Sequence, residues 1–395
     1  MNHGIEPVGR LILKPGKDKP IRRHHHWIFS GAVKSVDPYQ DGDVVQVFSA
    51  QKELLGTAYV KHHASITGRM VSFGTASAEE AIEEAISRAI ALREAFFDRK
   101  KTNAYRLIHA EGDSIPGLIV DQYDDTLVFQ SATAGVDRLK PFIVEILEKK
   151  LHPAGIYEKS DSGARQEEKL SEIKGALSGK LKKEIQILEN GLKFIVDIQE
   201  GQKTGFFLDQ REMRQRIREL SKDKKVLNVF GYTGGFTVAA LAGGAAQADT
   251  LDSSEAAILM AQKNVELNGF ESEKNQFVVA NAFEALRQQA PNHDIVILDP
   301  PAFAKRKTDV MNAGRGYKDI NRLAIAGMPK GSLLLTCSCS YHIDARLFQM
   351  VIFEAAHEAG RRVRIIERHR QAPDHPINIY HPENDYLKSL LLYID

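Results

Sequence analysis

Cysteine is nearly absent from this chain, whose 395 residues include only Cys337 and Cys339. Within one strand, residues two positions apart lie about 6.6 Å from each other, a separation that does not suit an ordinary structural disulfide. A Cys-x-Cys pair with no further cysteine is also a poor zinc site. Each cysteine is therefore a buried filler, a reactive thiol or a minor metal contact.

Long apolar runs are missing as well. None approaches the roughly 18 residues that a membrane-spanning helix needs, and the N-terminal residues lack the apolar core of a signal peptide. We therefore expect a cytoplasmic protein that does not contact a membrane.

The chain also lacks a strong charge of either sign. Its formal net charge is +1, so any surface that binds nucleic acid must be a local patch. Hydrophobic residues make up 43% and charged residues 27%, which is typical of a soluble globular protein. The length predicts two or three domains.

Two phosphate-binding motifs are absent from the glycine-rich segment "GYTGGF" at 231–236. No Lys-Ser or Lys-Thr pair follows the glycines, as a P-loop requires, and the Gly-x-Gly-x-x-Gly of dinucleotide binders is missing. The second absence disfavours an oxidoreductase.

What the chain does contain divides into three parts. Residues 1–78 show short strands bounded by Gly and Asp, and residues 79–184 combine helices and strands without a catalytic constellation. Residues 185–395 open with a hairpin at Asn190-Gly191. Strands and helices then alternate, the strand candidates being 225–230, 248–252, 275–280, 294–299 and 332–337. This alternation predicts an α/β fold with a parallel sheet and helices on both faces.

Ligands of such sheets bind at the carboxyl ends of the strands. The first strand candidate leads into Gly231, and the second ends on Asp252, 21 residues later, where an acidic side chain can accept hydrogen bonds from ribose hydroxyls. Asp252 can instead cap a helix, although Ser253 or Ser254 can also do so. The third strand ends on Asn281, which can read an adenine edge or cap a helix. Together these residues favour an adenosine-type ligand.

The fourth and fifth strand candidates end on "DPPAF" (299–303) and "TCSCS" (336–340). The two prolines hold Asp299 rigidly at the crevice, where its carboxylate can bind a ring nitrogen or an exocyclic amine of a base. Cys339 lies past the strand end and can be a thiolate nucleophile, helped by nearby basic residues. Cys337, still within the strand, is more simply a small core side chain.

With these residues assembled, the chain resembles the class I S-adenosylmethionine-dependent methyltransferases. More narrowly, it resembles the 23S ribosomal RNA cytosine-5 methyltransferases with an N-terminal PUA domain, the RlmI-like family. The matching stretches are "QKTGFFLDQR" (202–211), "VLNVFGYTGGFTVAAL" (226–241), "LDPPAFAK" (298–305), "RGYKDIN" (315–321), "SCS" (338–340) and "QAPDHP" (371–376), with a PUA-like portion at 27–33 and 42–47.

This resemblance implies a Rossmann-like, seven-stranded, mostly parallel sheet whose last strand is antiparallel. It would follow a β-rich PUA domain (1–78) and a middle α+β domain (79–184). It also implies that the methionine part of S-adenosylmethionine meets the glycine turn, the ribose meets Asp252, and the adenine meets Asn281. The implied cofactor contacts are Phe207, Asp209, Arg211, Asn228, Phe230, Gly231, Tyr232, Gly234, Asp252, Ser253, Asn281, Ala282 and Asp299.

The resemblance further implies 5-methylcytosine formation in large-subunit ribosomal RNA, with Cys339 and Asp299 as catalytic residues. A thiolate that adds to C6 makes C5 of cytosine nucleophilic, and a carboxylate stabilises the charge that develops; no metal is needed. Two departures stand out. Ala302 replaces a second cysteine that assists product release in many related enzymes, and His24, His25 and His26 replace the usual Gly-His-Pro.

Two regions are candidates for RNA contact. Basic residues between 10 and 23, including Arg22 and Arg23, precede Trp27 and form either a phosphate-binding patch beside an aromatic or a solvated edge. The long connection at 301–316 supplies Lys305 and Arg315, followed by Tyr317 and Lys318, and is either an RNA grip or a solvated lid. Five arginines between 361 and 370 indicate either a further patch or an exposed edge strand.

Two other functions stay open at this point. Asp-Pro-Pro with a nearby aromatic also serves methylation of exocyclic amines, and a ribosome-associated RNA-binding factor could hold the cofactor without turnover. The sequence does not determine which nucleotide is modified, or whether the substrate is naked RNA or a ribosomal particle. It also does not determine the oligomeric state, for which a homodimer is one expectation.

Overall fold

The computed structural model describes residues 5–304 and 306–395, so Lys305, a predicted RNA contact, lies outside the described residues. Contacts divide the chain into two compact units. The first contains the described residues up to Ile187, together with Val196–Leu208 and Pro373–Asn384; the second contains Leu188–Ile195, Asp209–Ala372 and Asp385–Asp395. Both units are therefore discontinuous in sequence. The boundaries expected at 78/79 and 184/185 stay predictions.

The first unit begins with a six-stranded sheet in the order β2-β6-β5-β4-β1-β3. Its strands are β1 (Arg10–Leu13), β2 (Trp27–Phe29), β3 (Val33–Val36), β4 (Val44–Phe48), β5 (Leu54–Val60) and β6 (Ile66–Phe73), with the short helix α1 (Lys19–Arg22) before β2. Alternate side chains such as Leu11, Leu13, Val45 and Val47 are buried on one another. This is the β-rich N-terminal part that the sequence predicted.

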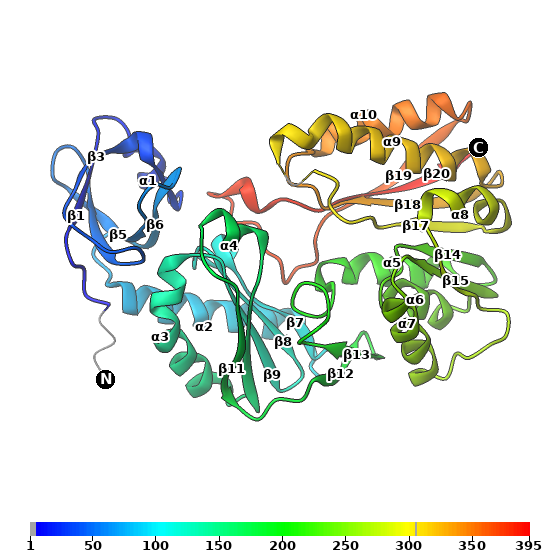
Figure 1. Ribbon diagram of the computed structural model, residues 1–395, viewed down its shortest axis with the longest axis horizontal. Coiled ribbons are helices and arrows are strands. Elements are labelled where there is room, and N and C mark those ends of the chain that lie inside the picture. The colour runs from blue at the N-terminus through cyan, green and yellow to red at the C-terminus, as the bar shows by residue number, and fades with distance from the viewer. Residues whose placement is uncertain (1–4, 305) are drawn as a thin grey trace. The chain divides into compact units, whose positions relative to one another are not determined.

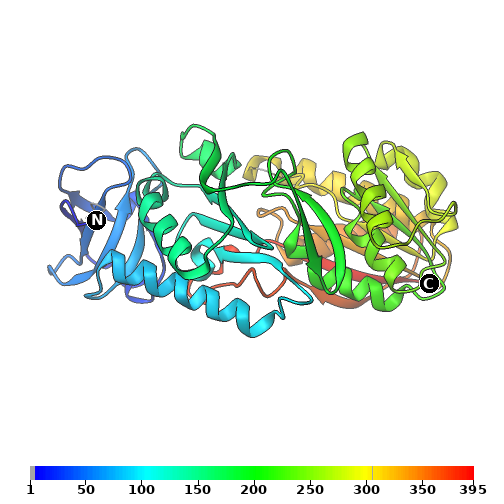
Figure 2. The same ribbon diagram turned by 90° about the horizontal axis from the view of Figure 1, so that it is seen from below.

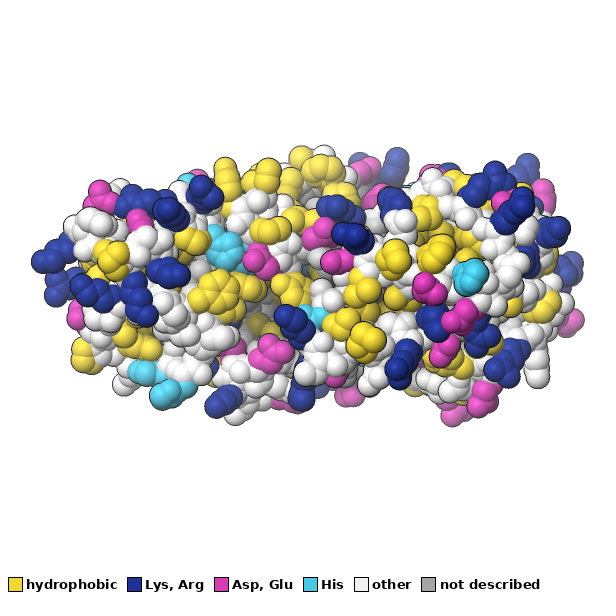
Figure 3. Space-filling model, turned by 90° about the horizontal axis from the view of Figure 1, so that it is seen from above, with side chains coloured by type: hydrophobic (Ala, Val, Ile, Leu, Met, Phe, Trp, Pro, Cys, Tyr) yellow, Lys and Arg dark blue, Asp and Glu magenta, His cyan; other side chains and the backbone are white. Residues whose placement is uncertain are grey.

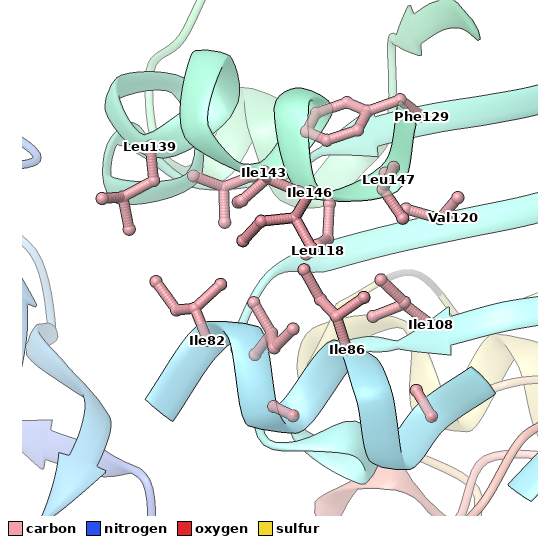
Figure 4. Close-up of a cluster of buried hydrophobic side chains, with 14 of the residues drawn as sticks. Ile82, Ile86, Ile108, Leu118, Val120, Phe129, Leu139, Ile143, Ile146 and Leu147 are labelled. Atoms are coloured by element: carbon pink, nitrogen blue, oxygen red, sulfur yellow. The ribbon is translucent and has the colours of Figure 1, made fainter. Parts of the chain in front are cut away.

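A five-stranded sheet in the order β11-β10-β9-β8-β7 follows in the same unit. Its strands are β7 (Ala104–His109), β8 (Leu118–Tyr123), β9 (Thr126–Ser131), β10 (Gly155–Ser160) and β11 (Ile173–Gly179), and its longer helices are α2 (Ala78–Phe96) and α3 (Ala134–Leu151). Figure 4 shows Ile82 and Ile86 of α2 facing Ile143 and Ile146 of α3, beside Leu118 of β8. The apolar stripes of both helices are thus the core of this α+β part.

A hairpin of β12 (Glu184–Glu189) and β13 (Leu192–Asp197) comes next. Asn190 and Gly191 have positive φ values of 50° and 80°, which suits the two-residue turn predicted from the Asn-Gly pair.

The second unit contains a seven-stranded sheet in the order β16-β15-β14-β17-β18-β20-β19. Its strands are β14 (Lys225–Val229), β15 (Gln247–Asp252), β16 (Phe277–Val279), β17 (Ile295–Leu298), β18 (Ser332–Ser338), β19 (Val363–His369) and β20 (Lys388–Ile394). The last strand, β20, runs antiparallel to both of its neighbours, whereas the pairs among β14–β18 are parallel. The predicted class I methyltransferase architecture is therefore confirmed.

Helices cover both faces of this sheet. Figure 1 shows α9 (Val310–Gly327) and α10 (Ala345–Glu358) on one face and α5 (Arg211–Leu220), α6 (Gly235–Ala242) and α7 (Glu255–Leu267) on the other, and Figure 2 looks toward the second face. The first face also receives α8 (Ala282–Gln289), whose Leu286 shares a core with Ile320 of α9 and Phe348 of α10. Among the described residues, no helix has both the length and the apolar character needed to cross a bilayer.

One expectation about this unit needs correction. The connection after β17 was expected to reach Arg315, but α9 already begins at Val310, after a short 3-10 turn at Lys307–Asp309. Arg315, Tyr317 and Lys318 therefore lie on a helix. The buried residues Ala313, Tyr317, Ile320 and Ala324 recur at helical spacing, which the basic neighbours had obscured.

Candidate cofactor and catalytic site

The turn between β14 and α6 is held in an unusual backbone conformation. Phe230 and Tyr232 have positive φ values of 59° and 44°, and Gly234 has one of 78°. Such φ values cost non-glycine residues about 1–3 kcal/mol each. A Cβ atom on Gly231 would lie only 2.4 Å from Thr250 Cγ2, so only glycine lets this turn pack against β15. The turn is thus built to bring backbone close to whatever occupies the carboxyl end of β14.

Asp252, at the end of β15, is fixed from two sides. Its Oδ2 accepts a hydrogen bond from Tyr232 N at 3.0 Å, and its Oδ1 accepts one from Ser254 N at 2.9 Å. The side chain that caps α7 is Ser254, which accepts from Ala257 N, so Asp252 is not needed for that role. A carboxylate has about four acceptor positions, and Asp252 can therefore still accept hydrogen bonds from a ligand. Ser253 is exposed beside it.

Asn281 follows β16 and caps α8. Its Oδ1 accepts a hydrogen bond from Phe283 N at 2.9 Å, and the residue is exposed. The cap alternative from the sequence is thus realised, and a contact with an adenine can use the Asn281 Nδ2 group or the second acceptor position of Oδ1. Ala282, buried at the start of α8, offers its backbone alone.

Polar side chains are buried behind the glycine turn. Asn228 Nδ2 donates to Thr237 Oγ1 at 3.0 Å, and Thr237 Oγ1 lies 2.7 Å from Thr250 Oγ1, which ties β14, α6 and β15 together. Asn228 Oδ1 and Thr233 Oγ1 have no hydrogen-bond partner among the described residues. Buried polar atoms of this kind are normally satisfied. These two polar groups lie beside the glycine turn, where they can form hydrogen bonds with the amino-acid part of S-adenosylmethionine.

The ends of β17 and β18 lie side by side because these strands pair in parallel, with Leu298 opposite Thr336. Asp299 and Cys339 follow these two ends, and Cys339 Sγ lies 3.9 Å from the carbonyl oxygen of Pro300. Gln210 Nε2 donates to Asp299 Oδ1 at 2.9 Å and orients that carboxylate. The structure therefore brings together the two residues predicted to be catalytic.

The two cysteines differ in environment. Cys339 is half-buried, whereas Cys337 is fully buried in the core between β18 and the α5–α6 face. Burial raises the pKa of the Cys337 thiol well above its ordinary value. The expected contrast between an accessible thiol and a packed one is thus present.

Ser340 fixes the backbone just after Cys339, a role that the sequence did not indicate. Its Oγ accepts a hydrogen bond from Ala304 N at 3.2 Å and lies 3.0 Å from Tyr317 Oη. Tyr317 itself was expected to contact RNA, but it is 0% exposed, and its ring packs against those of Phe303 and Phe348. We correct that expectation: Tyr317 supports the loop that carries Cys339.

Lys388, at the start of β20, is a second residue that the sequence did not single out. It pairs with Ser338 across the sheet, and its Nζ donates to the carbonyl oxygens of Ser340 at 2.7 Å and Tyr386 at 2.6 Å. Burial lowers the Lys388 pKa to about 8, against the raising effects of Cys339, Asp385 and Asp344. A lysine opening the apolar run "LKSLLLYI" (387–394) is the signal that could have revealed it.

The segment before α5 contributes three predicted cofactor contacts. Asp209 is buried, and its Oδ2 accepts a 2.6 Å hydrogen bond from Tyr386 Oη. Arg211 is also buried, with its Nε 3.6 Å from Glu189 Oε2. Phe207 belongs to the first unit, where Lys203 Nζ lies 4.4 Å from its ring centroid. These contacts show how the three side chains are held; their roles toward a cofactor stay predictions.

The predicted RNA contacts near the N-terminus lie in the first unit. Arg22 and Arg23 are exposed, and Arg22 pairs with Asp18 at 2.6 Å and with Glu53. Figure 3 shows Lys and Arg side chains gathered over the six-stranded sheet, at the left of the view. Trp27 is partly buried, and its Nε1 donates to Glu111 at 2.8 Å. A pocket of about 300 Å³ nearby is lined mainly by apolar residues, including Trp27 and Phe29, with Lys17 as the one charged residue among the described lining residues.

The predicted contacts in the second unit differ from one another. Arg315 is exposed on α9, whereas Lys318 Nζ makes a 2.6 Å ion pair with Glu358. The arginine-rich segment near 361–370 contains β19, the outermost strand of its sheet, where Arg364 pairs with Asp395. The edge-strand alternative is therefore realised.

Comparisons with known proteins agree with this architecture. The family described as S-adenosylmethionine-dependent methyltransferase matches residues 168–392, and the PUA-like domain family matches residues 11–73. The chain is 40% identical to ribosomal RNA large subunit methyltransferase I of Alteromonas mediterranea, over 97% of this chain and 98% of that relative. It is 42% identical to the protein of the same name from Vibrio cholerae, over 96% and 97% of the two chains.

Two solved structures match nearly the full length of the chain. A chain from Streptococcus mutans, assigned as an S-adenosylmethionine-dependent methyltransferase, superposes with a TM-score of 0.83 and 25% identity, covering 97% of this chain and 99% of that one. A methyltransferase structure complexed with SAH superposes with a TM-score of 0.84 and 26% identity, with the same coverage.

Proposed function

The chain belongs to the S-adenosylmethionine-dependent methyltransferases, in the family of ribosomal RNA large subunit methyltransferase I, and on this premise we propose that it methylates C5 of a cytosine in large-subunit ribosomal RNA. The observation that carries the choice of C5 is the pairing of Cys339 and Asp299 at the ends of adjacent parallel strands. Methylation of C5 needs a nucleophile at C6, and a half-buried thiol beside a fixed carboxylate meets that need.

We assign the cofactor to the carboxyl ends of β14, β15 and β16. S-adenosylmethionine, when bound, supplies a methyl group on a positively charged sulfur. The glycine turn and Asn228 would hold the methionine part, Asp252 the ribose, and Asn281 with Ala282 the adenine. The unpartnered Asn228 Oδ1 and the two-sided fixation of Asp252 support this assignment.

The step that we assign to Cys339 is addition to the base. Its thiolate forms a bond to C6 of the cytosine, and the electron pair of the C5–C6 double bond moves toward C5. Asp299 binds N3 or N4, and its carboxyl group, when it carries a proton, donates that proton to N3 and so stabilises the negative charge that results. After methylation, a base removes the proton from C5, the double bond re-forms, and the thiolate leaves C6. Ala302 stands where related enzymes have a second cysteine, so another group must assist release.

We further propose that Lys388 favours the thiolate form of Cys339. The Cys339 thiolate raises the pKa of Lys388, and because electrostatic attraction is mutual, the Lys388 ammonium in turn favours the thiolate form of Cys339. Asp344 and Asp385 also raise the pKa of Lys388, which helps to keep that side chain an ammonium. Lys388 acts through the thiol and the adjacent carbonyl, so we regard it as a positioning residue.

One alternative chemistry, methylation of an exocyclic amine, is disfavoured by a specific contact. Enzymes of that type use an aromatic after Asp-Pro-Pro against the target base. Here the ring of Phe303 packs on Tyr317, with centroids 4.6 Å apart, and a Cβ on Gly316 would lie 3.1 Å from Phe303 Cδ2. The Phe303 ring therefore packs within its own loop, which disfavours its use against a target base.

The direct test is transfer of tritium from labelled S-adenosylmethionine to unmodified ribosomal RNA, followed by nucleoside analysis. The proposal expects label in 5-methylcytosine. Label in N4-methylcytosine would favour the amine chemistry, and RNA binding without any label would favour a factor that holds the cofactor without turnover. RNA contact by Arg22, Arg23, Trp27, Arg315 and Lys318, a cytoplasmic location and a homodimer stay predictions.

A further inference from the structure

Three potential metal ligands meet in the first unit, which does not contain Cys339. His25 precedes β2, whereas His381 and Glu383 belong to the C-terminal segment Pro373–Asn384. His25 Nε2 lies 3.4 Å from Glu383 Oε1, and His381 Nδ1 lies 3.6 Å from Glu383 Oε2. One ligand atom from each of the three residues falls within 4.8 Å of the others. Segments more than 350 positions apart in the chain therefore present imidazole and carboxylate groups to one another.

These separations match those of ligands on a single ion. Two atoms bound to zinc at about 2.0–2.1 Å in a tetrahedron lie roughly 3.4 Å apart. The contacts of His25 and His381 with Glu383 are near that value, although they use different carboxylate oxygens, and an ion would have to draw single atoms that now lie within 4.8 Å of one another closer together. Two histidines and one carboxylate are a ligand set found at zinc sites, with the fourth position left to water.

The hydrogen bonding of His381 points independently to a missing partner. The residue is 0% exposed, and neither ring nitrogen has a hydrogen-bond partner among the described residues. A buried imidazole with two unsatisfied nitrogens requires an explanation such as an ion.

The neighbouring groups are compatible with this role. Trp27 packs edge-on against His381, with ring centroids 4.5 Å apart, which shields one side of the cluster. His26 is also buried without a hydrogen-bond partner for either nitrogen among the described residues, and its ring lies edge-on to that of His381, with centroids 5.9 Å apart. His25 Nδ1 accepts a 3.2 Å hydrogen bond from Trp27 N. Ligation through Nε2 would move the ring proton to Nδ1 and give up that bond.

We propose that His25, His381 and Glu383 bind one divalent transition-metal ion of the zinc type, which fastens the segment Pro373–Asn384 to the start of β2. All three ligands belong to a contact within the first unit that is non-covalent apart from this ion. The expectation from the sequence that no metal is needed concerned methyl transfer and is independent of this site.

The test uses the full chain, stripped with a chelator and then titrated with Zn²⁺ by calorimetry and with Co²⁺ by visible absorption. The proposal expects one ion per chain, with the absorption of tetrahedral Co²⁺, and a rise in melting temperature on adding Zn²⁺. Glu383→Gln, at a partly exposed position, should weaken Zn²⁺ binding more than about tenfold and remove the thermal shift. His25→Ala should do the same. Near-ultraviolet circular dichroism of both variants shows whether they keep the fold.

His62→Ala is the matched control, because His62 also contacts a carboxylate, Asp41, at 2.8 Å but lies on the surface. This variant should bind Zn²⁺ as the unaltered chain does. A chain that takes up no stoichiometric metal would overturn the proposal. So would folded Glu383→Gln and His25→Ala variants that bind Zn²⁺ with unchanged affinity.

Discussion

Lys388 Nζ donates a 2.7 Å hydrogen bond to the carbonyl oxygen of Ser340, the residue that follows Cys339. A buried cation thus sits beside the backbone that carries the proposed nucleophile. Because burial lowers the Lys388 pKa only to about 8, the side chain is mostly an ammonium at neutral pH. This hydrogen bond connects β20, the antiparallel last strand, to the segment after β18 that carries the proposed nucleophile.

The first prediction concerns the reactivity of Cys339 in Lys388→Gln. Loss of the ammonium should favour the neutral thiol of Cys339 over its thiolate, which lowers the rate of alkylation by iodoacetamide near pH 7. The difference in alkylation rate between Lys388→Gln and the unaltered chain should be largest below pH 8. It should become smaller above pH 8, because Lys388 of the unaltered chain then loses its own proton. Cys337 should not interfere, since it is buried.

Lys330→Gln is the control for this experiment, because Lys330 is exposed just before the opposite end of β18. Its alkylation profile should match that of the unaltered chain. If Lys388→Gln alkylates with an unchanged pH profile, Lys388 has no electrostatic effect on the thiol. That result would leave the role of Cys339 in methyl transfer untouched.

The second prediction concerns the glycine turn. Gly231→Ala places a Cβ 2.4 Å from Thr250 Cγ2, and overpacking of this size costs about 1–3 kcal/mol. We expect binding of S-adenosylhomocysteine, measured by calorimetry, to weaken about tenfold or more if the turn shifts. Thr250→Ser removes the clashing methyl group but keeps the hydroxyl bonded to Thr237, so the double variant should regain part of the affinity. No recovery would mean that the clash with Thr250 is not the cause.

A third prediction concerns Gln210, which orients Asp299 through a 2.9 Å hydrogen bond. A hydrogen bond to a charged group contributes about 1.5–3 kcal/mol, so Gln210→Leu should lower kcat about 10- to 100-fold. Binding of S-adenosylhomocysteine should change little, because Asp252 and the glycine turn are unaltered. Gln215→Leu, on a more exposed part of α5, is the control. Equal activity of Gln210→Leu and Gln215→Leu would show that orientation of Asp299 by Gln210 does not contribute to catalysis.

Much of this site could be predicted from the sequence, because strand ends in a parallel sheet are marked by local patterns. Gly231, Asp252 and Cys339 each follow an apolar strand candidate, and the sheet topology brings such ends to one edge. Lys388 could not be found in this way. It lies 49 positions after Cys339 and reaches Ser340 only through the antiparallel register of β20 on β18.

Two other features were missed, one despite a local pattern and one because no local pattern marks it. Tyr317 lies among basic residues and looked like a surface contact, yet its spacing from Ala313 and Ile320 places it on the buried stripe of α9. The return of Pro373–Asn384 to the first unit has no local signal at all. Only contacts such as that of His381 with Trp27 show it.

The central claim, covalent methylation of C5 through Cys339, is tested most directly by a matched pair of cysteine variants. Tritium transfer and 5-methylcytosine content should be measured on unmodified large-subunit ribosomal RNA for Cys339→Ala and Cys337→Ala. We predict no detectable 5-methylcytosine with Cys339→Ala, despite retained binding of S-adenosylhomocysteine, and substantial activity with Cys337→Ala. Formation of 5-methylcytosine by Cys339→Ala at the rate of the unaltered chain would contradict the account.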